Sequence, residues 1–234
     1  MKSEFIFIIS DEQAPAQHVD RLAFYKALIR KYGKPSWVVH VGDEVDQEAL
    51  NEYGKNPDLP GDGDELALAQ RALQPLFSLF SRVDLLESNH VLRAKRKAAR
   101  VGLSEKRLRP WGSVIGAPKG WTWHKSLILP TKGGQVFFCH GKSKNGLKLV
   151  KEMGMSVVQG HYHTEFGIQY TSNPKSLNFS LQVGCMINTK HPAFAYDAEN
   201  VARPIIGCAG IINGFPKLFP MLLDKRGRWV GVVP

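Results

Sequence analysis

The chain has 234 residues, of which 43% are hydrophobic and 22% are charged, and its formal net charge is +10. This composition is typical of a folded globular protein and excludes a largely disordered chain, and the length predicts a single domain over residues 1–234. The apolar run at residues 5–9 is too short for a signal or membrane segment, and three widely separated cysteines do not indicate a disulfide framework. We therefore expect a cytoplasmic protein without membrane association, of unknown oligomeric state.

Charge is unevenly distributed along the sequence. Residues 91–110 contain eight basic residues and one acid, whereas residues 43–65 contain nine acids and one base. Uneven charge of this kind indicates a functional surface, and the basic segment indicates a polyanionic partner.

The first half of the sequence alternates between short apolar runs and amphipathic segments. Buried strands are predicted at residues 5–9, 37–41 and 83–87. Helices are predicted at residues 17–32, ended by Gly33 and Pro35, at 65–80, with a kink at Pro75, and in the basic segment up to Gly102. The Gly/Pro/Asp-rich segment 51–64 predicts an exposed loop.

The second half is rich in predicted strands. These cover residues 121–129, 135–140, 156–159, 176–183, 204–212 and 229–233, with further closing strands around 216–229 and a turn at 226–227. Only residues 144–153 predict a helix there. Strand–helix alternation followed by a strand-rich half predicts α/β layers with a second sheet.

Asp, Asn or His side chains follow five of the apolar runs. In chain order the motifs are Asp11-Glu12-Gln13, Gly42-Asp43-Glu44-Val45-Asp46, Asn89-His90, His140-Gly141 and Gly160-His161-Tyr162-His163. Ligands of layered α/β proteins bind at the carboxyl ends of strands, where side chains from short loops converge. A set that contains only oxygen and nitrogen donors suits hard or borderline metal ions.

This ordered set resembles the motifs of the calcineurin-like metallophosphoesterase superfamily: Asp-x-His, Gly-Asp, Gly-Asn-His-Asp/Glu, a single His and Gly-His-x-His. The resemblance spans residues 5–165. It implies an αββα sandwich, in which two packed β-sheets are flanked by helices. It also implies a hydrolase of phosphate esters, in which two divalent ions about 3.5–4 Å apart supply a hydroxide for attack and stabilise charge on the phosphoryl oxygens.

The resemblance also implies a role for each motif residue. The first metal ion would be held by Asp11, Gln13, Asp43 and His163. The second would be held by Asp43, Asn89, His140 and His161, so that Asp43 bridges the two ions. His90 would be the catalytic residue that protonates the leaving oxygen or stabilises its charge.

Two motifs depart from the family pattern. Gln13 stands where the family has His, and because an amide oxygen is a weaker and harder donor, we expect weaker binding at the first site. Mn²⁺ is the preferred assignment, with Mg²⁺, Fe²⁺ and Zn²⁺ as alternatives, and whether Gln13 coordinates at all is open. The Asn89-His90 motif lacks the acid that follows it in the family. Asp46 is a candidate replacement, because a carboxylate often orients a functional imidazole.

The basic residues after His90 are candidates for binding the substrate: Arg93, Lys95, Arg96 and Lys97. A cationic strip near a phosphoesterase site attracts a nucleic-acid backbone, so a nuclease or phosphodiesterase acting on nucleic acid is the preferred interpretation. Three tryptophans, Trp111, Trp121 and Trp123, offer either stacking surfaces or core side chains.

Two other interpretations stay open. The first is a phosphatase or a small-molecule (nucleotide) phosphodiesterase, in which the basic segment serves only solubility. The second is a non-catalytic nucleic-acid-binding protein on a lapsed phosphoesterase scaffold, which the departures at Gln13 and after His90 would favour.

Overall fold

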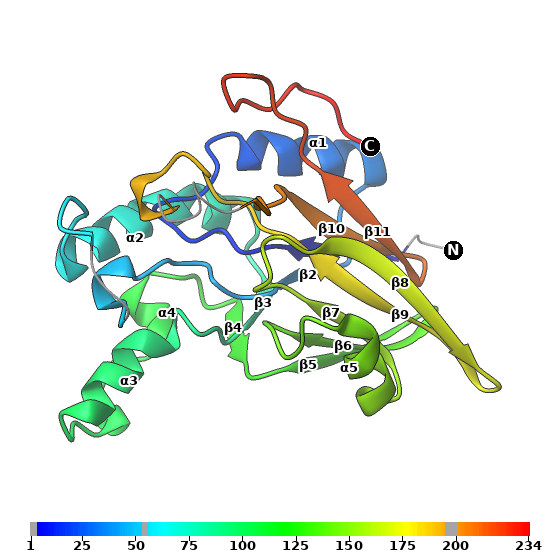
Figure 1. Cartoon of the computed structure of the whole chain (residues 1–234), viewed down its shortest axis with the longest axis horizontal. Helices are drawn as coiled ribbons and strands as arrows, with labels where there is room; N and C mark the ends of the chain where they lie inside the picture. Colours follow the sequence, from blue (N-terminus) through cyan, green and yellow to red (C-terminus); the bar gives the residue numbers. More distant parts are fainter. Residues whose placement is uncertain (1–3, 53–55, 195–200) are drawn as a thin grey trace.

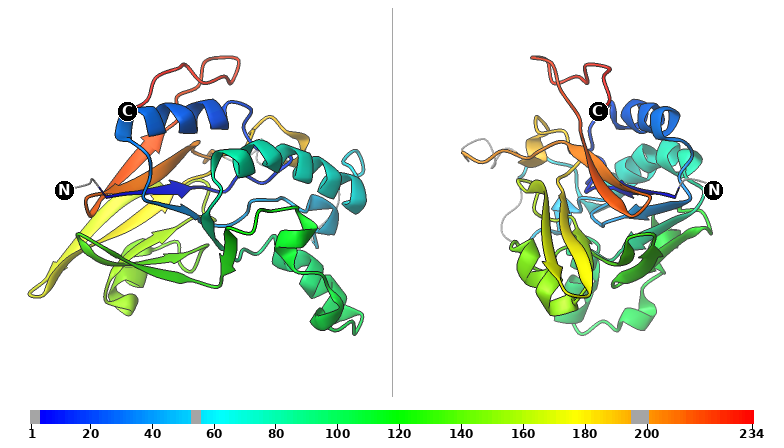
Figure 2. Two further views of the ribbon diagram at one scale, coloured as in Figure 1. Left: turned by 180° about the vertical axis from the view of Figure 1, so that it is seen from behind. Right: turned by 90° about the vertical axis from the view of Figure 1, so that its right-hand side faces the viewer.

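Two β-sheets pack face to face, and helices cover their outer faces, in the computed structural model of the chain (Figures 1 and 2). The structure describes residues 4–52, 56–194 and 201–234. The predicted fold class, an α/β sandwich of two sheets flanked by helices, is confirmed.

The first sheet has six strands in the order β11-β10-β1-β2-β3-β4. Strands β1 to β4 are parallel to one another, β10 pairs antiparallel with β1, and β11 pairs antiparallel with β10. Their bounds are β1 Phe5–Ile9, β2 Trp37–His40, β3 Val83–Leu86, β4 Trp121–His124, β10 Gly207–Ile212 and β11 Phe215–Pro220.

The second sheet has five strands in the order β5-β6-β7-β9-β8. The three central strands are parallel, and each edge strand pairs antiparallel with its neighbour. Their bounds are β5 Leu127–Thr131, β6 Gly134–Cys139, β7 Ser156–Gln159, β8 Phe166–Asn173 and β9 Ser176–Val183.

The helices occupy three places around the sheets. Helices α1 and α2 pack on the outer face of the first sheet, and α5 packs on the outer face of the second. Helices α3 and α4 lie at one end of the layers, and α3 projects away from them (Figure 1). Their bounds are α1 Arg21–Tyr32, α2 Asp62–Leu79, α3 Leu92–Arg100, α4 Trp111–Val114 and α5 Gly146–Met153, with 3₁₀ helices at Glu48–Leu50 and Glu105–Arg107.

Strand β1 shows why the two sheets pack as they do. All five of its residues are buried, and alternate side chains point to opposite faces. Phe5, Phe7 and Ile9 pack in the core under α1 and α2, whereas Ile6 and Ile8 pack in the core between the sheets. Burial of each such side chain stabilises the fold by about 1.5–3 kcal/mol. The continuous apolar run therefore fixes β1 at the centre of the molecule.

Several predicted elements need correction. The expected strand at 121–129 is two strands in different sheets, β4 and β5, because the chain turns between His124 and Leu127. Residues 229–233 form no strand beyond an isolated bridge of Trp229 with Leu223. Helix α1 begins at Arg21, not at residue 17, because Gln17 forms an isolated bridge with Ile187.

Two further differences concern the start of one helix and one missing strand. Helix α2 begins at Asp62, inside the segment that was expected to be a loop, and it contains Pro75 as predicted. Part of that expected loop, residues 53–55, lies outside the described residues. Strand β8 was not predicted. Within the described part of the chain, no helix is both long enough and apolar enough to cross a membrane.

Candidate metal centre

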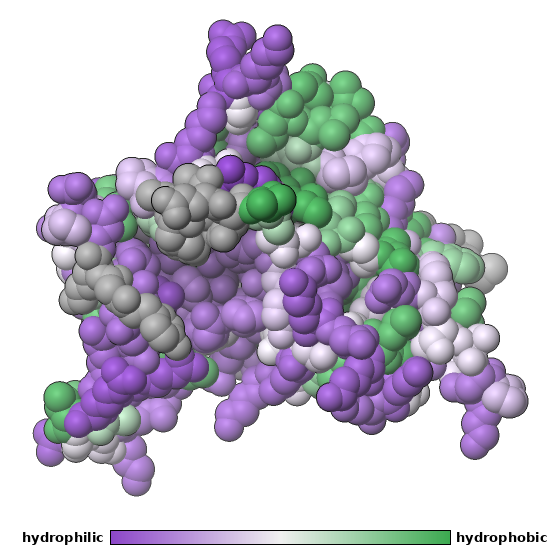
Figure 3. Space-filling model, viewed as in Figure 1, coloured by the Kyte–Doolittle hydropathy of each residue, from purple (hydrophilic) through white to green (hydrophobic). Residues whose placement is uncertain are grey.

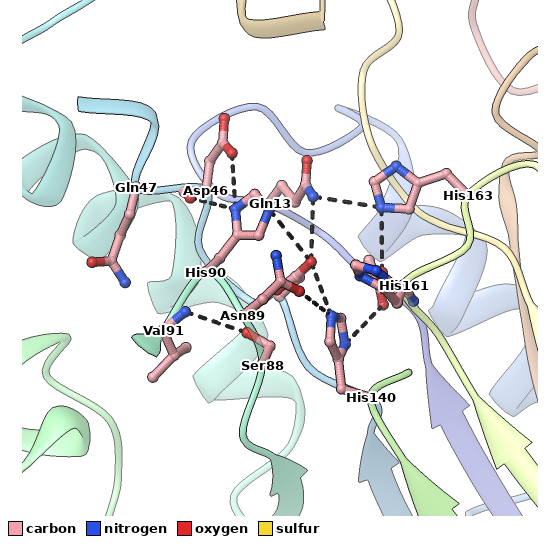
Figure 4. Close-up of polar contacts among 12 residues, drawn as sticks. Gln13, Asp46, Gln47, Ser88, Asn89, His90, Val91, His140, His161 and His163 are labelled. Atoms are coloured by element: carbon pink, nitrogen blue, oxygen red, sulfur yellow. Dashed lines mark hydrogen bonds and ion pairs between the residues drawn. The ribbon is translucent and has the colours of Figure 1, made fainter. Parts of the chain in front are cut away.

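The five motifs meet at one end of the two packed sheets. The first three follow β1, β2 and β3 of the first sheet, and the last two follow β6 and β7 of the second. Since these are parallel strands, their carboxyl ends bring the motif side chains together, as the close-up shows (Figure 4). On the face shown in Figure 3, hydrophilic side chains line the hollow between the α3 region and the sheets.

Two groups of three potential metal ligands form at this point. In the first, made of Asp11, Asp43 and His163, one ligand atom of each residue lies within 4.8 Å of those of the other two. The same holds in the second, made of Asp43, His140 and His161. Asp43 belongs to both groups, which is the division that the family resemblance implies. The geometry brings the side chains together, and their roles as ligands stay a prediction.

Asn89 and His140 extend the second group. Nε2 of His140 lies 2.8 Å from Oδ1 of Asn89 and 3.3 Å from Oδ2 of Asp43. Nδ1 of His140 lies 2.9 Å from the carbonyl oxygen of Val41. A carbonyl only accepts hydrogen bonds, so Nδ1 carries the hydrogen, and a neutral ring then keeps its Nε2 lone pair for a metal ion.

The charges at the centre call for a cation. Burial alone would raise the pKa of Asp43, but His140 and His90 outweigh it and hold that pKa well below its usual range. Burial alone would lower the pKa of His140, but Asp43 and Asp11 raise it to about 9. The buried carboxylate of Asp43 therefore stays ionised beside a positive charge, which either protons or metal ions supply.

Three buried oxygen atoms at the centre have no hydrogen-bond partner: Oδ1 of Asp11, Oε1 of Gln13 and Oδ1 of Asp43. A buried acceptor without a partner costs about 1–3 kcal/mol, and most buried polar atoms avoid this cost. The oxygens of Asp11 and Asp43 fit a site that binds cations, and Oε1 of Gln13 would join them after rotation of its amide group.

The backbone at the centre is strained. Gln13, Asp43 and His161 have φ angles of 50°, 52° and 68°, a region that residues with side chains rarely adopt. Such strain concentrates at functional sites. Gly160 allows the close approach of two motifs, because a Cβ atom there would lie 2.3 Å from Oδ1 of Asp11. The peptide N–H of His161 donates to Oδ2 of Asp11 at 2.7 Å, which fixes the first motif against the fifth.

Gln13 lies at the first group and is only 3% exposed. Its Nε2 is 3.5 Å from Oδ2 of Asp43 and 3.5 Å from Nε2 of His163. The two ends of an amide have nearly the same shape, so rotation about the last side-chain bond would turn Oε1 toward the same two atoms. The position of Gln13 therefore suits a ligand of the first site, and its coordination of a metal ion stays a prediction.

His90 lies beside the groups without belonging to either. Its Nδ1 lies 3.2 Å from Oδ1 of Asp46 and contacts the Asp46 carbonyl, and its Nε2 is 3.7 Å from Oδ2 of Asp43. Burial lowers the pKa of His90, but the carboxylates of Asp43 and Asp46 outweigh it, and the pKa is raised overall. Asp46 thus stands in the place proposed for it, where it can orient the ring.

The four basic residues proposed for substrate binding lie in different environments. Arg93 donates from Nη1 to the carbonyl oxygens of Asp46 and Gln47, at 2.9 Å and 3.0 Å. Lys95 forms an ion pair with Glu105 at 2.6 Å. Arg96 is exposed and Lys97 half-buried, both on α3. Of the four, Arg93 lies against the His90 ring, and Arg96 contacts the Asn89 carbonyl at 3.5 Å.

Glu44 is a buried residue of the centre that the sequence patterns did not single out. Its Oε1 accepts hydrogen bonds from the indole N–H groups of Trp111, at 2.6 Å, and Trp123, at 3.0 Å. Burial raises the pKa of Glu44 to about 7, although both indoles act to lower it. Trp121 is buried and donates to the Phe80 carbonyl. The stacking interpretation of these tryptophans is therefore wrong for Trp121, and the other two bind Glu44.

A second buried cluster supports the first motif. Glu12 accepts hydrogen bonds from Nε of Arg21 at 3.1 Å and from the Tyr25 hydroxyl at 3.0 Å. Both donors belong to α1, so the cluster ties the loop that contains Asp11 and Gln13 to that helix.

Comparisons with known proteins give structural likenesses only. No protein-family model and no curated protein matches the sequence. Vps29 of Chaetomium thermophilum aligns with 99% of this chain and 96% of its own, at 13% identity and a TM-score of 0.49. An archaeal phosphodiesterase aligns with 98% of this chain and 99% of its own, at 14% identity and a TM-score of 0.41. The Thermotoga maritima protein TM1076 aligns with 99% of this chain and 96% of its own, at 15% identity and a TM-score of 0.36. At these low identities and TM-scores, nothing about the activity of this chain follows from the likenesses.

Proposed function

We propose that this chain is a metal-dependent phosphoesterase that holds two divalent metal ions, Mn²⁺ by preference, and cleaves phosphodiesters of nucleic acid. The observation that carries the proposal is Asp43, a buried carboxylate shared by two groups of ligands. The buried oxygens without partners on Asp11 and Asp43 also support it. Bound metal ions would activate water for attack and stabilise charge on the phosphoryl oxygens.

The protein residues supply orientation and a proton. The Val41 carbonyl holds His140 with Nε2 directed toward Asp43 and Asn89. Asp46 holds His90 with Nε2 directed toward the same centre, where the ring can donate a proton to the leaving oxygen. Neither His90 nor Asp46 belongs to a ligand group, so both are available for this task.

The charge of the region beyond His90 supports a polyanionic substrate. Five basic residues of α3 and the following segment are exposed: Arg96, Arg100, Lys106, Arg107 and Arg109. Of these, Arg100 pairs with Glu52 at 2.8 Å. Exposed cations beside a phosphoesterase centre bind a nucleic-acid backbone with an affinity that falls steeply with salt.

The proposal is tested by metal analysis and cleavage assays on the purified full chain. We expect up to two Mn²⁺ per chain at saturation, and Mn²⁺-dependent cleavage of labelled single- or double-stranded DNA or RNA that weakens as salt rises. An Asp43→Asn variant should lose metal binding and cleavage, whereas Asp20→Asn, in an exposed ion pair away from the centre, should keep both. A parent protein without bound metal at saturating Mn²⁺ would overturn the proposal.

A small-molecule substrate is the second candidate, because ion pairs of Lys95 and Arg100 neutralise part of the basic segment. Hydrolysis of bis(p-nitrophenyl) phosphate or a nucleotide, unaffected by reversing the charge at Arg96 and Lys97, would identify it. Nucleic-acid binding that persists in Asp43→Ala and His161→Ala, in a parent without metal-dependent turnover, would instead identify a non-catalytic binding protein.

A further inference from the structure

Arg93 is a half-buried cation at the edge of the candidate centre. It lies in the first turn of α3, and its side chain is 14% exposed. Its Nη1 donates to the carbonyl oxygens of Asp46 and Gln47. These two hydrogen bonds fix the guanidinium plane against the loop that contains Asp43.

The other terminal nitrogen of Arg93 faces the reaction centre. Nη2 lies 3.4 Å from Nε2 of His90, and that imidazole nitrogen lies 3.7 Å from Oδ2 of Asp43. An anionic oxygen beside Nε2 of His90 is therefore within reach of Nη2 of Arg93 as well. A guanidinium stays charged at all relevant pH values, so this donor is always available.

The surroundings of Arg93 leave this charge only partly compensated. The nearest carboxylate oxygens belong to Glu48, at 3.8 Å, and Asp46, at 4.0 Å, so neither makes a close ion pair with it. Asp46 is also engaged with His90. In a buried site of low dielectric, a charge-assisted hydrogen bond to a phosphoryl oxygen is stronger than at the surface.

We propose that Arg93 binds a non-bridging oxygen of the scissile phosphoryl group, while the adjacent His90 faces the leaving oxygen. This inference rests on the proposed phosphoesterase function. It gives Arg93 a different role from the three basic residues that follow it, Lys95, Arg96 and Lys97. Lys95 is directed to Glu105, and Arg96 contacts only the Asn89 carbonyl, at 3.5 Å, from an exposed position. Arg93 thus acts on the reacting group, and the others belong to the outer basic surface.

The test measures binding of inorganic phosphate to the Mn²⁺-loaded full chain by calorimetry, together with kcat and KM on bis(p-nitrophenyl) phosphate. For Arg93→Gln we expect phosphate affinity to fall at least about tenfold and kcat/KM to fall about 100- to 1,000-fold. Arg30→Gln removes the same charge from an exposed position on α1, outside the basic segment, and its phosphate affinity should stay within about twofold of the parent. Bound Mn²⁺ should be unchanged in both variants.

A purely structural role for Arg93 gives a different result. If Arg93 only anchors the loop, Arg93→Gln loses Mn²⁺ and phosphate together, which overturns the proposal. Phosphate binding by Arg93→Gln equal to that of Arg30→Gln overturns it too. Arg93→Lys keeps the charge without the planar fork, so we expect it to recover part of the phosphate affinity; it also serves as the test if Arg93→Gln does not fold.

The two proposals fail separately. If the parent hydrolyses no ester and yet binds phosphate through Arg93, the phosphoesterase function fails and the anion contact stands. If the parent hydrolyses esters and Arg93→Gln retains both turnover and phosphate affinity, only the assignment of Arg93 fails. A Mn²⁺-loaded parent that binds no phosphate overturns the Arg93 contact directly.

Discussion

Oδ1 of Asp46 lies 3.2 Å from Nδ1 of His90, and the carbonyl oxygen of Asp46 faces the same ring nitrogen. Both oxygens accept hydrogen bonds, so Nδ1 carries a hydrogen, and Nε2 faces Asp43 and carries a second hydrogen when the ring is charged. One residue therefore sets the tautomer and the orientation of the imidazole. This is the function that a following acid would serve in the Asn-His motif of the family.

Asp46→Asn is expected to reduce kcat by about 10- to 100-fold, because loss of a carboxylate that orients an imidazole typically has an effect of that size. Bound Mn²⁺ should stay unchanged, since Asp46 belongs to neither ligand group. Steady-state kinetics with metal analysis of the same sample checks this. His163→Ala is the matched control and should lose metal. Undiminished turnover in Asp46→Asn would show that the backbone carbonyl alone orients His90.

Gln13→His is expected to strengthen metal binding at the first site and to shift its preference toward Zn²⁺. Imidazole is a softer and stronger donor than an amide oxygen, and the side chain at position 13 already lies within 3.5 Å of Asp43 and His163. Titrations with Mn²⁺ and Zn²⁺ should show the weaker of two binding steps tightening by about tenfold or more in the variant. Gln13→Ala provides the comparison, and identical titrations for all three proteins would remove Gln13 from the ligand set.

The parts of the fold that position the centre were predictable because their strands are buried on both faces. Such strands are continuous apolar runs, as in β1, and they need no partner information to be found. Strand β8 escaped prediction because it is a largely exposed edge strand with a polar sequence after Ile168. The opposite error concerns residues 229–233, where a strand was predicted and only an isolated bridge forms. Trp229 packs on Phe24 of α1, so this apolar segment covers a helix and does not extend a sheet.

The ligand set was predictable for the same reason, since each motif directly follows a predicted strand. The contacts around it were not. Arg93 donates to the backbone carbonyl oxygens of Asp46 and Gln47, far from it in the chain. Every residue has a backbone carbonyl, so the sequence gives no sign of these contacts. Glu44 meets Trp111 and Trp123 only after α4 and β4 are placed. Such contacts depend on tertiary structure, and a motif does not encode them.

Added Mn²⁺ is expected to stabilise the folded chain, because a ligand that binds only the native state shifts the folding equilibrium toward it. At 100 times Kd the gain is about 2.7 kcal/mol, which raises Tm by about 5–10 °C for a chain of this length. Asp43→Asn removes the carboxylate common to both groups and should abolish the shift. Thermal melts with Mn²⁺ and with EDTA measure it, and a full shift retained in Asp43→Asn would place the bound metal elsewhere.

Trp111→Phe is expected to lower the free energy of unfolding by about 1–2 kcal/mol. The variant removes a 2.6 Å hydrogen bond to Oε1 of Glu44, a carboxylate whose Oε2 already has no partner. Trp123→Phe removes the 3.0 Å bond to the same oxygen and should cost a similar amount. Urea unfolding of both variants and of the double variant measures the coupling through Glu44. Strictly additive losses would show that the two indoles act independently.

The ion pair between Asp20 and Arg228 predicts a pH dependence of stability away from the metal centre. Nε and Nη2 of Arg228 lie 2.7 Å and 2.5 Å from the Asp20 carboxylate. These hydrogen bonds, with the Trp229 N–H, lower the pKa of Asp20 to about 2 from an ordinary value of 3.8. Because the folded pKa is the lower one, the stabilisation is present above about pH 4 and is lost as pH falls toward 2. Asp20→Asn should therefore destabilise the chain by about 0.5–1 kcal/mol at pH 7 and by much less near pH 2. Arg228→Met should reproduce this profile in urea unfolding across that range, and an equal loss at both pH values would mean that the pair contributes through packing alone.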